Sequence, residues 1–332
     1  MTLIKQIELP NGRRTTNLGF GCAGLLRLPT ARRRDYLLKT AVEEGITHFD
    51  VARMYGFGEA EGIVGASLKP YRDRVTLASK FGLPYATSAG FSFNIQSIAR
   101  WILGFNPLLK SAIRKVAFKK ARSAHQPASG NNYSIDEMQK SLEMSLRQLQ
   151  TDRVDLLFLH APEIHDFIPE NMSEALQQKK TSGKIGAFGV SGYRAELEYF
   201  LKARPDICGD AIQYHYSILE KGSASKLLRH PFAGIFGVID GTHRRLYQYL
   251  SKNRSFTKLW SERLGIELKN RENVGIIILA IALALNSQGM VLFFTSNPQR
   301  LRHIIRQLTG NFFSEEKLLE FREAVIQGIY AN

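Results

Sequence analysis

The stretch Thr47-His48-Phe49-Asp50-Val51-Ala52-Arg53-Met54-Tyr55-Gly56 decides how the rest of this chain is interpreted. Thr47 to Phe49 is predicted to end a buried strand, which places the Asp50 carboxylate at the strand's tip and Tyr55 in the following loop. Taken alone, such an arrangement is more often structural than catalytic. The pair of Asp50 and Tyr55 would be catalytic if the Tyr55 phenol must give up a proton. Whether it does depends on which polar residues the other strands place beside it.

A short apolar run followed by a longer amphipathic one recurs along the chain. The runs predicted as strands are Leu18–Ala23, Thr47–Phe49, Val75–Ser79, Val154–Leu159, Ile185–Val190, Ala211–Tyr214, Gly234–Ile239 and Met290–Phe294. Helices are predicted near Ala31–Glu44, Glu59–Ser67, Ser134–Gln148, Glu170–Thr181, Ala195–Ala203 and within Glu272–Leu285. Alternating strands and helices imply a parallel sheet covered on both faces, and eight units favour a closed (β/α)8 TIM barrel over an open doubly wound sheet.

Two additions to the barrel are expected. Leu3–Leu9, the turn Pro10-Asn11-Gly12 and the return through Thr15 and Thr16 predict an N-terminal β-hairpin. A basic, helical insertion, 84–133, follows the third strand. The whole of 1–332 is expected to be one α/β barrel domain.

Composition and charge limit the classes of protein to consider. The chain has 332 residues, is 44% hydrophobic and 23% charged, and carries two cysteines, which is typical of a soluble globular enzyme and excludes a disulfide scaffold. The N-terminus predicts no signal peptide, and the apolar run Val274–Leu285 is shorter than the roughly 20 residues of a membrane helix, so cytoplasmic localisation is expected. The net charge of +15 favours anionic partners: a phosphorylated cofactor, an acidic substrate, nucleic acid or an anionic membrane.

Polar residues end several of the predicted strands. In a (β/α)8 barrel, residues at the carboxyl ends of the strands converge on one mouth. Any one of them could be structural, but several titratable groups at neighbouring strand ends favour a catalytic site. These residues are Asp50, Lys80, His160, Ser191 and Gln213, with Tyr55 in the loop after Asp50.

The residue types predict proton transfer. A free phenol has a pKa of about 10, and a nearby ammonium favours the phenolate. We expect Asp50 to hold Lys80, Lys80 to lower the pKa of Tyr55, and Tyr55 to act as general acid/base while His160 positions a substrate oxygen. No cysteine, Ser–His or metal-ligand cluster stands at these positions, so an external cofactor is expected to supply the remaining chemistry, and hydride transfer to a carbonyl carbon pairs naturally with proton transfer to its oxygen.

With these residues in place, the chain resembles the aldo-keto reductase superfamily. The family's Asp, Tyr, Lys and His fall on Asp50, Tyr55, Lys80 and His160, and the stretches GITHFDVARMYG, VTLASKFG, LQTDRVDLLFLHAP and GKIGAFGVSGY match as well. The likeness covers most of the chain except about 84–132 and 220–270. It implies a metal-free, nicotinamide-dependent oxidoreductase that interconverts a small carbonyl substrate, sugar-like or hydroxylated, and its alcohol. The alternative is a nucleotide-sensing regulatory barrel like the potassium-channel β subunits; oligomeric state stays open.

The same resemblance implies a set of cofactor-binding residues. Ser191 and Gln213 would hold the nicotinamide carboxamide, although Gly192 stands where the family has Asn. Thr295, Ser296 and Asn297 resemble the adenosine-phosphate loop, and Arg300 falls where an arginine binds the 2′-phosphate, which favours NADP over NAD. Phe294 occupies the place of a lysine in many members, so NAD stays open. On the seventh strand, the stretch Gly237–Gly241 offers no aromatic ring to stack on the nicotinamide.

The insertion has a composition of its own. No Asp or Glu occurs from Pro84 to Ile135, whereas seven cations do: Arg100, Lys110, Arg114, Lys115, Lys119, Lys120 and Arg122. Apolar spacing predicts two amphipathic helices, near 94–104 and 108–122, interrupted at Pro107. Three interpretations are open: packing on the barrel with solvated charges, a lid that recruits an anionic or bulky substrate, or contact with a membrane surface. The aromatic spacing shows no base-stacking pattern, which argues against nucleic acid.

Overall fold

Eight parallel strands close into a barrel in this computed structural model, which describes residues 2–83, 131–220, 226–310 and 312–330. The order β10-β3-β4-β5-β6-β7-β8-β9 places each strand beside its sequence neighbour, and β10 closes the ring against β3. The strands are β3 (Leu18–Gly21), β4 (His48–Asp50), β5 (Thr76–Phe81), β6 (Val154–His160), β7 (Ile185–Gly192), β8 (Ala211–His215), β9 (Ala233–Phe236) and β10 (Met290–Phe293). The predicted (β/α)8 fold is confirmed.

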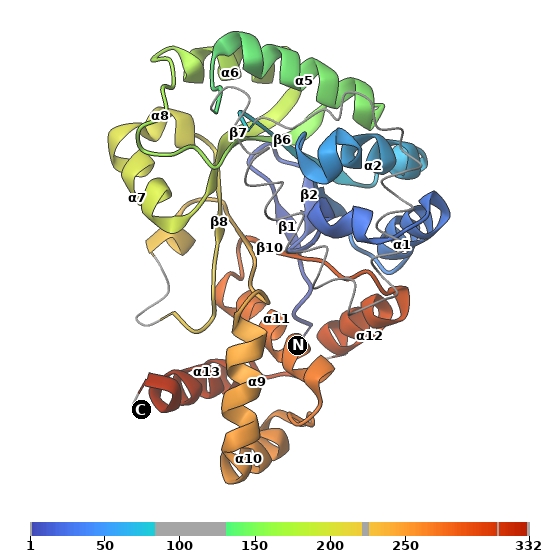
Figure 1. Ribbon diagram of the computed structural model, residues 1–332, viewed down its shortest axis with the longest axis vertical. Coiled ribbons are helices and arrows are strands. Elements are labelled where there is room, and N and C mark those ends of the chain that lie inside the picture. The colour runs from blue at the N-terminus through green and yellow to red at the C-terminus, as the bar shows by residue number, and fades with distance from the viewer. Residues whose placement is uncertain (1, 84–130, 221–225, 311, 331–332) are drawn as a thin grey trace, which may run out of the picture.

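Helices surround the barrel, and α9 and α10 project from one end of the molecule (Figure 1). Their bounds are α1 (Ala31–Glu43), α2 (Ala60–Leu68), α5 (Ile135–Leu149), α6 (Met172–Thr181), α7 (Arg194–Ala203), α8 (Pro205–Cys208), α9 (Thr242–Lys252), α10 (Arg254–Leu264), α11 (Arg271–Leu285), α12 (Pro298–Thr309) and α13 (Glu315–Tyr330). The apolar run Val274–Leu285 lies in α11 and is mostly buried. Among the described residues, no helix is both long and apolar enough to cross a membrane.

The expected N-terminal hairpin closes the end of the barrel at which the strands begin. Its strands β1 (Gln6–Glu8) and β2 (Arg14–Thr16) pair in antiparallel fashion. Ile7 and Leu9 belong to the same apolar cluster as the inward-facing residues Leu156, Phe158 and Leu292 of the barrel strands. The bottom of the barrel is therefore plugged, and only the opposite end is left for ligands.

A buried carboxylate ties the hairpin to the barrel. Asp155 at the start of β6 is fully buried and accepts hydrogen bonds from the Arg13 guanidinium at 2.8 Å, the Arg72 guanidinium at 3.2 Å and the backbone N–H of Leu77 at 2.8 Å. Because every bond joins segments far apart in sequence, this cluster holds the hairpin in place.

One expectation changes with the structure. The seventh barrel strand ends at Phe236 rather than at Ile239, because Gly237 has a φ of 70° and turns the chain away. The predicted insertion helices, 94–104 and 108–122, lie outside the described residues. The structure also has α9 and α10 at 242–264, a stretch for which the sequence analysis assigned no element.

Candidate active site

The strand register brings the predicted polar residues to one end of the barrel. His160 on β6 pairs with Ser191 on β7, and Ser191 pairs with Gln213 on β8. Asp50, the last residue of β4, pairs with a residue of β5 two positions before Lys80. All strands are parallel, so their carboxyl ends lie at the same end of the barrel. The strands of a closed barrel are tilted and staggered, and this stagger brings the residues near those ends to a similar height.

A buried hydrogen-bonded chain forms the floor of the site. The Lys80 ammonium donates to Asp50 Oδ1 at 2.5 Å and to the carbonyl oxygen of Val51 at 3.1 Å. Gln213 Nε2 donates to the other oxygen of Asp50 at 2.8 Å, and Ser191 Oγ donates to Gln213 Oε1 at 2.7 Å. Both oxygens of Asp50 are thus engaged, which compensates the cost of burying the Asp50–Lys80 pair.

Tyr55 and His160 lie above this floor. The Lys80 nitrogen is 5.2 Å from the centroid of the Tyr55 ring. The rings of Tyr55 and His160 meet edge to face, with centroids 5.8 Å apart and an interplanar angle of 80°. The structure therefore brings Asp50, Tyr55, Lys80 and His160 together, as the sequence predicted.

The environment sets the protonation state of each group. Burial raises the pKa of Tyr55, and it outweighs the lowering effect of Lys80. The sequence predicted a lowered value, so the direction was wrong, because the site shields the phenolate from water more than the ammonium compensates. Burial opposes the charge on Lys80, but Asp50 and Tyr55 raise its pKa overall, so the ammonium persists. Burial, together with Lys80, lowers the pKa of His160 to about 3, which leaves a neutral imidazole.

His160 is positioned through its backbone. The hydroxyl of Tyr133, just before α5, donates to the carbonyl oxygen of His160 at 2.7 Å. Ala161 follows with a φ of 51° and donates its N–H to Ser191 at 2.5 Å. The Tyr133 ring packs on Gly82, where a Cβ would lie 2.0 Å from it. Tyr133 was not predicted, because nothing local in the sequence links it to His160.

A cleft of about 640 Å³ opens beside Tyr55 and Asp50. Backbone of Gly21 and Gly24 forms one wall, and Gln213 lies at its base. Besides Tyr55, the aromatic side chains in its wall are Tyr193, His215, Phe236, Phe293 and Phe294. Tyr193 and His215 stand two residues after Ser191 and Gln213, a spacing that could have identified them. The expectation that the seventh strand offers no aromatic ring overlooked Phe236, because the strand ends earlier than predicted.

The predicted adenosine-phosphate loop connects β10 to α12. Asn297 caps α12, and its side-chain oxygen accepts the N–H groups of Gln299 at 2.8 Å and Arg300 at 3.0 Å. Thr295 is buried, while Ser296 is exposed. The Arg300 guanidinium pairs with Glu272 at the start of α11, with Nε and one terminal nitrogen 3.0 and 2.9 Å from the same oxygen.

Comparison with known proteins identifies the family. The model of the Aldo/keto reductase family matches residues 17–325. The chain belongs to the aldo/keto reductase family. Family membership places it among oxidoreductases.

Individual relatives of this aldo-keto reductase are distant. Aldo-keto reductase YhdN of Bacillus subtilis is 30% identical over 199 residues, 59% of this chain and 46% of that protein. The 6-dehydroglucose reductase of Agrobacterium fabrum is 29% identical over 161 residues, 47% of this chain and 42% of that protein. The D-threo-aldose 1-dehydrogenase of a Pseudomonas species is 26% identical over 221 residues, 64% of this chain and 60% of that protein. The matches therefore span about half of these relatives.

Solved structures share the fold over almost the whole chain. The glycerol dehydrogenase of Gluconobacter oxydans has a TM-score of 0.68 at 18% identity, over 98% of this chain and 96% of that one. An aldo-keto reductase of Klebsiella pneumoniae in complex with NADPH has a TM-score of 0.64 at 19% identity, over 97% of this chain and 95% of that one. No group of three or more His, Cys, Asp or Glu that could hold a metal ion occurs within the described part of the chain.

Proposed function

We propose that this aldo-keto reductase interconverts a carbonyl compound and its alcohol with NADP(H), and that Tyr55 is the general acid/base. The observation that carries the proposal is the buried Asp50–Lys80 pair, 2.5 Å between its charged atoms, directly beneath the Tyr55 ring. A buried ion pair adds little stability, so its place under a phenol favours a chemical role. The bound nicotinamide would supply or accept the hydride at the carbonyl carbon.

Each residue of the site then has a distinct task. In reduction, Tyr55 donates its proton to the carbonyl oxygen, and its raised pKa keeps it protonated near neutral pH. The Lys80 ammonium stabilises the phenolate left behind, and Asp50 fixes that ammonium in place. Neutral His160 donates a ring N–H to the same oxygen and aims it at Tyr55. In oxidation the proton returns along the same path.

The cleft suits the nicotinamide end of a dinucleotide. Ser191 and Gln213 offer a hydroxyl and an amide for a carboxamide, and the walls supply aromatic surface. Its volume of about 640 Å³ lies within the range of small-ligand sites. NADP is favoured because the Arg300 guanidinium lies in the first turn of α12, where a 2′-phosphate would displace Glu272. A structural relative from Klebsiella pneumoniae was solved with NADPH.

Replacing Arg300 by Ala tests the cofactor assignment. The dissociation constant for NADPH should rise by about tenfold or more, and that for NADH should change little, because only NADPH carries the 2′-phosphate. Fluorescence titration of the purified protein with each nucleotide measures both. Equal effects on the two nucleotides would place the 2′-phosphate elsewhere.

For the substrate we propose a hydroxylated, sugar-like carbonyl. Relatives in sequence carry the names 6-dehydroglucose reductase and D-threo-aldose 1-dehydrogenase. Both cysteines are free and buried, which favours a reducing compartment, so we propose a cytoplasmic enzyme. The stretch 1–332 would act as one catalytic domain.

The rate of carbonyl reduction by the Tyr55→Phe variant tests whether Tyr55 is the general acid. NADPH oxidation with a panel of aldehydes, hydroxyaldehydes and aldoses should fall by about 10²–10⁴-fold, because the general acid is gone. Binding of NADPH should stay near the native value, since the ring is kept. Retained turnover would mean that another group supplies the proton. Tight NADPH binding by the native protein without turnover of any carbonyl would favour the regulatory alternative.

A further inference from the structure

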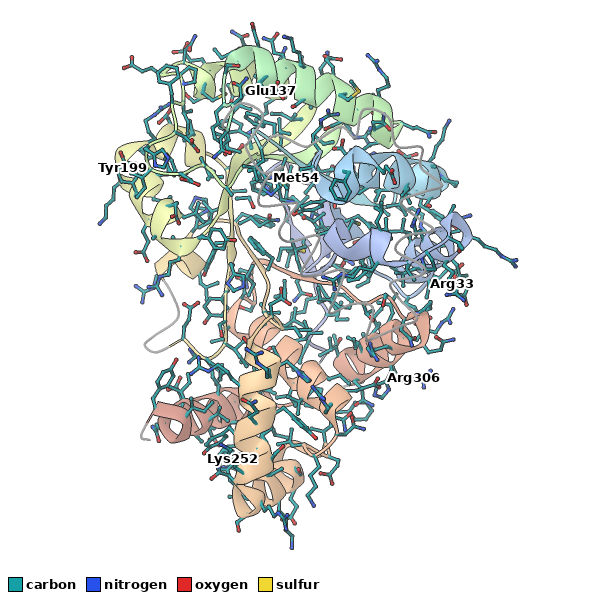
Figure 2. All side chains as sticks on the ribbon, in the orientation of Figure 1. Arg33, Met54, Glu137, Tyr199, Lys252 and Arg306 are labelled. Atoms are coloured by element: carbon teal, nitrogen blue, oxygen red, sulfur yellow. The ribbon has the colours of Figure 1, made fainter. Side chains whose placement is uncertain are left out.

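A second cleft lies between α9 and α10, away from the catalytic loop. It has a volume of about 420 Å³ and is lined by side chains of α9, α10 and the segment before α11: Tyr247, Leu250, Ser251, Arg254, Thr257, Leu268 and Lys269. Figure 2 shows Lys252 at the end of α9 that is remote from Met54, the neighbour of Tyr55. The cleft is therefore separate from the catalytic Tyr55.

The surroundings of this cleft are strongly cationic. The stretch 242–271 contains eight Lys and Arg residues and two Glu residues. Arg254 and Lys269 line the cleft, and the Arg271 guanidinium lies 5.0 Å from the centroid of the Tyr247 ring in its wall. None of these three cations makes an ion pair with any residue that the structure describes, whereas Arg263 nearby pairs with Glu320.

In the described part of the chain, the acidic residues of the region form no ion pair with Arg254, Lys269 or Arg271. Glu267 accepts the backbone N–H of Lys269 at 3.0 Å, and Glu262 lies on α10 beside another cleft, which Arg263 also lines. Elsewhere on the surface, cations such as Arg302 and Lys180 do pair with carboxylates. Clustered cations without such partners raise the electrostatic energy of the folded state, and an anion held between them would lower it.

The remaining lining groups fit an anion that carries an apolar body. Tyr247 brings a hydroxyl group, whereas the Ser251 and Thr257 hydroxyls donate to the backbone carbonyls of Tyr247 and Leu250. The first turn of α10, which contains Arg254, has no side-chain cap at its N-terminus. Leu250 and Leu268 form a buried apolar base. Guanidinium, ammonium and hydroxyl groups are the side chains that bind phosphate, while leucine and a tyrosine ring bind hydrocarbon.

We propose that this cleft binds a small phosphate monoester, with Arg254 and Lys269 on the phosphate and Leu250 and Leu268 under its organic part. The site does not depend on the catalytic activity proposed above. The site lies on the helical pair α9 and α10, outside the barrel.

Calorimetric titration tests the site with two probes, inorganic phosphate and phenyl phosphate. The native protein is titrated at low ionic strength with saturating NADPH, which occupies the candidate cofactor loop, and again without NADPH. Phenyl phosphate should bind more tightly than inorganic phosphate, because the leucines add apolar contact. The double variant Arg254→Ala/Lys269→Ala should weaken phenyl phosphate by about tenfold or more.

A matched double variant supplies the control. Arg244→Ala/Lys258→Ala removes two exposed cations from the same helices without touching the cleft lining, and it should bind phenyl phosphate as the native protein does. Equal weakening in both double variants would reveal general charge attraction and overturn the proposal. So would binding of neither probe at millimolar concentration. Binding of phosphatidic acid vesicles through Arg254 and Lys269 without binding of phenyl phosphate would assign the surface to a membrane instead, and would also overturn it.

Discussion

Replacing Lys80 by Met separates the two roles of the buried ammonium. Lys80 donates to Asp50 at 2.5 Å and lies 5.2 Å from the Tyr55 ring centroid. Methionine has a similar length and no charge, so it should fill the space without supplying either interaction. The variant should therefore lose stability, because the buried Asp50 carboxylate loses its ion-pair partner. It should also lose activity in the oxidation direction, because the Tyr55 phenolate loses the nearby positive charge.

The electrostatic effect on Tyr55 follows from the distance. The ring centroid stands in here for the phenolate charge, part of which is delocalised onto the ring. Two unit charges at that distance, 5.2 Å, interact by about 3 kcal/mol at an effective dielectric constant of about 20. Losing that stabilisation of the phenolate corresponds to about 100-fold in its population at fixed pH. Alcohol oxidation near neutral pH should fall by about that factor. Reduction, which begins from the protonated phenol, should lose less.

The effect on stability follows from the uncompensated carboxylate. With Lys80 gone, Asp50 keeps, among the described residues, the bond from Gln213 at 2.8 Å. A buried charge without its partner costs about 3–5 kcal/mol. Urea denaturation at pH 7 measures this loss. Adding Asp50→Asn to Lys80→Met should restore part of it, because no charge is then left buried.

The assay is the ratio of oxidation to reduction rates across pH, measured for the native protein, Lys80→Met and Lys80→Arg. Lys80→Arg keeps a cation and should shift that ratio less than Lys80→Met. An unchanged ratio in Lys80→Met, with both rates lowered equally, would refute the idea that Lys80 sets the acidity of Tyr55. If the losses in free energy of unfolding caused by Asp50→Asn and Lys80→Met simply added in the double variant, the charge-pair explanation of stability would be refuted.

Two further predictions concern stability. Gly82→Ala should destabilise the protein by several kcal/mol, because its φ is 105° and a Cβ would lie 2.0 Å from the Tyr133 ring, whereas Gly183→Ala, at a φ of 73° with nothing within 4 Å, should cost only about 1 kcal/mol in urea denaturation. His48 and His160 have pKa values lowered to about 4 and about 3, so below pH 6.5 the unfolded chain takes up protons that the folded chain does not. Stability should therefore fall by about 1.4 kcal/mol per pH unit for each histidine between about pH 6 and pH 4, and His48→Asn should roughly halve that slope; a flat profile would contradict the neutral, buried imidazoles.

Much of the candidate site was predictable because its parts are local in the sequence. Asp50 and His160 each end an apolar run, and Lys80 ends another, so strand periodicity and parallel packing suffice to gather them at one mouth. The direction of the pKa shift of Tyr55 was not predictable in this way. It depends on how much water the packed loops exclude, a property of the closed barrel that no short stretch of sequence contains.

Sequence patterns among neighbouring residues were sufficient to predict the barrel, its hairpin and the polar strand-end residues. The alternation of strand and helix, and the polar residue at each strand end, can both be recognised in short stretches of sequence. Several features came only from tertiary structure, among them the Gln213 bond to Asp50, the Glu272 partner of Arg300 and the cationic cleft between α9 and α10. Each joins groups whose approach is set by barrel closure and helix packing. Sequence patterns specify which face of an element is buried, but the identity of the facing side chain is decided by the packing of the whole chain.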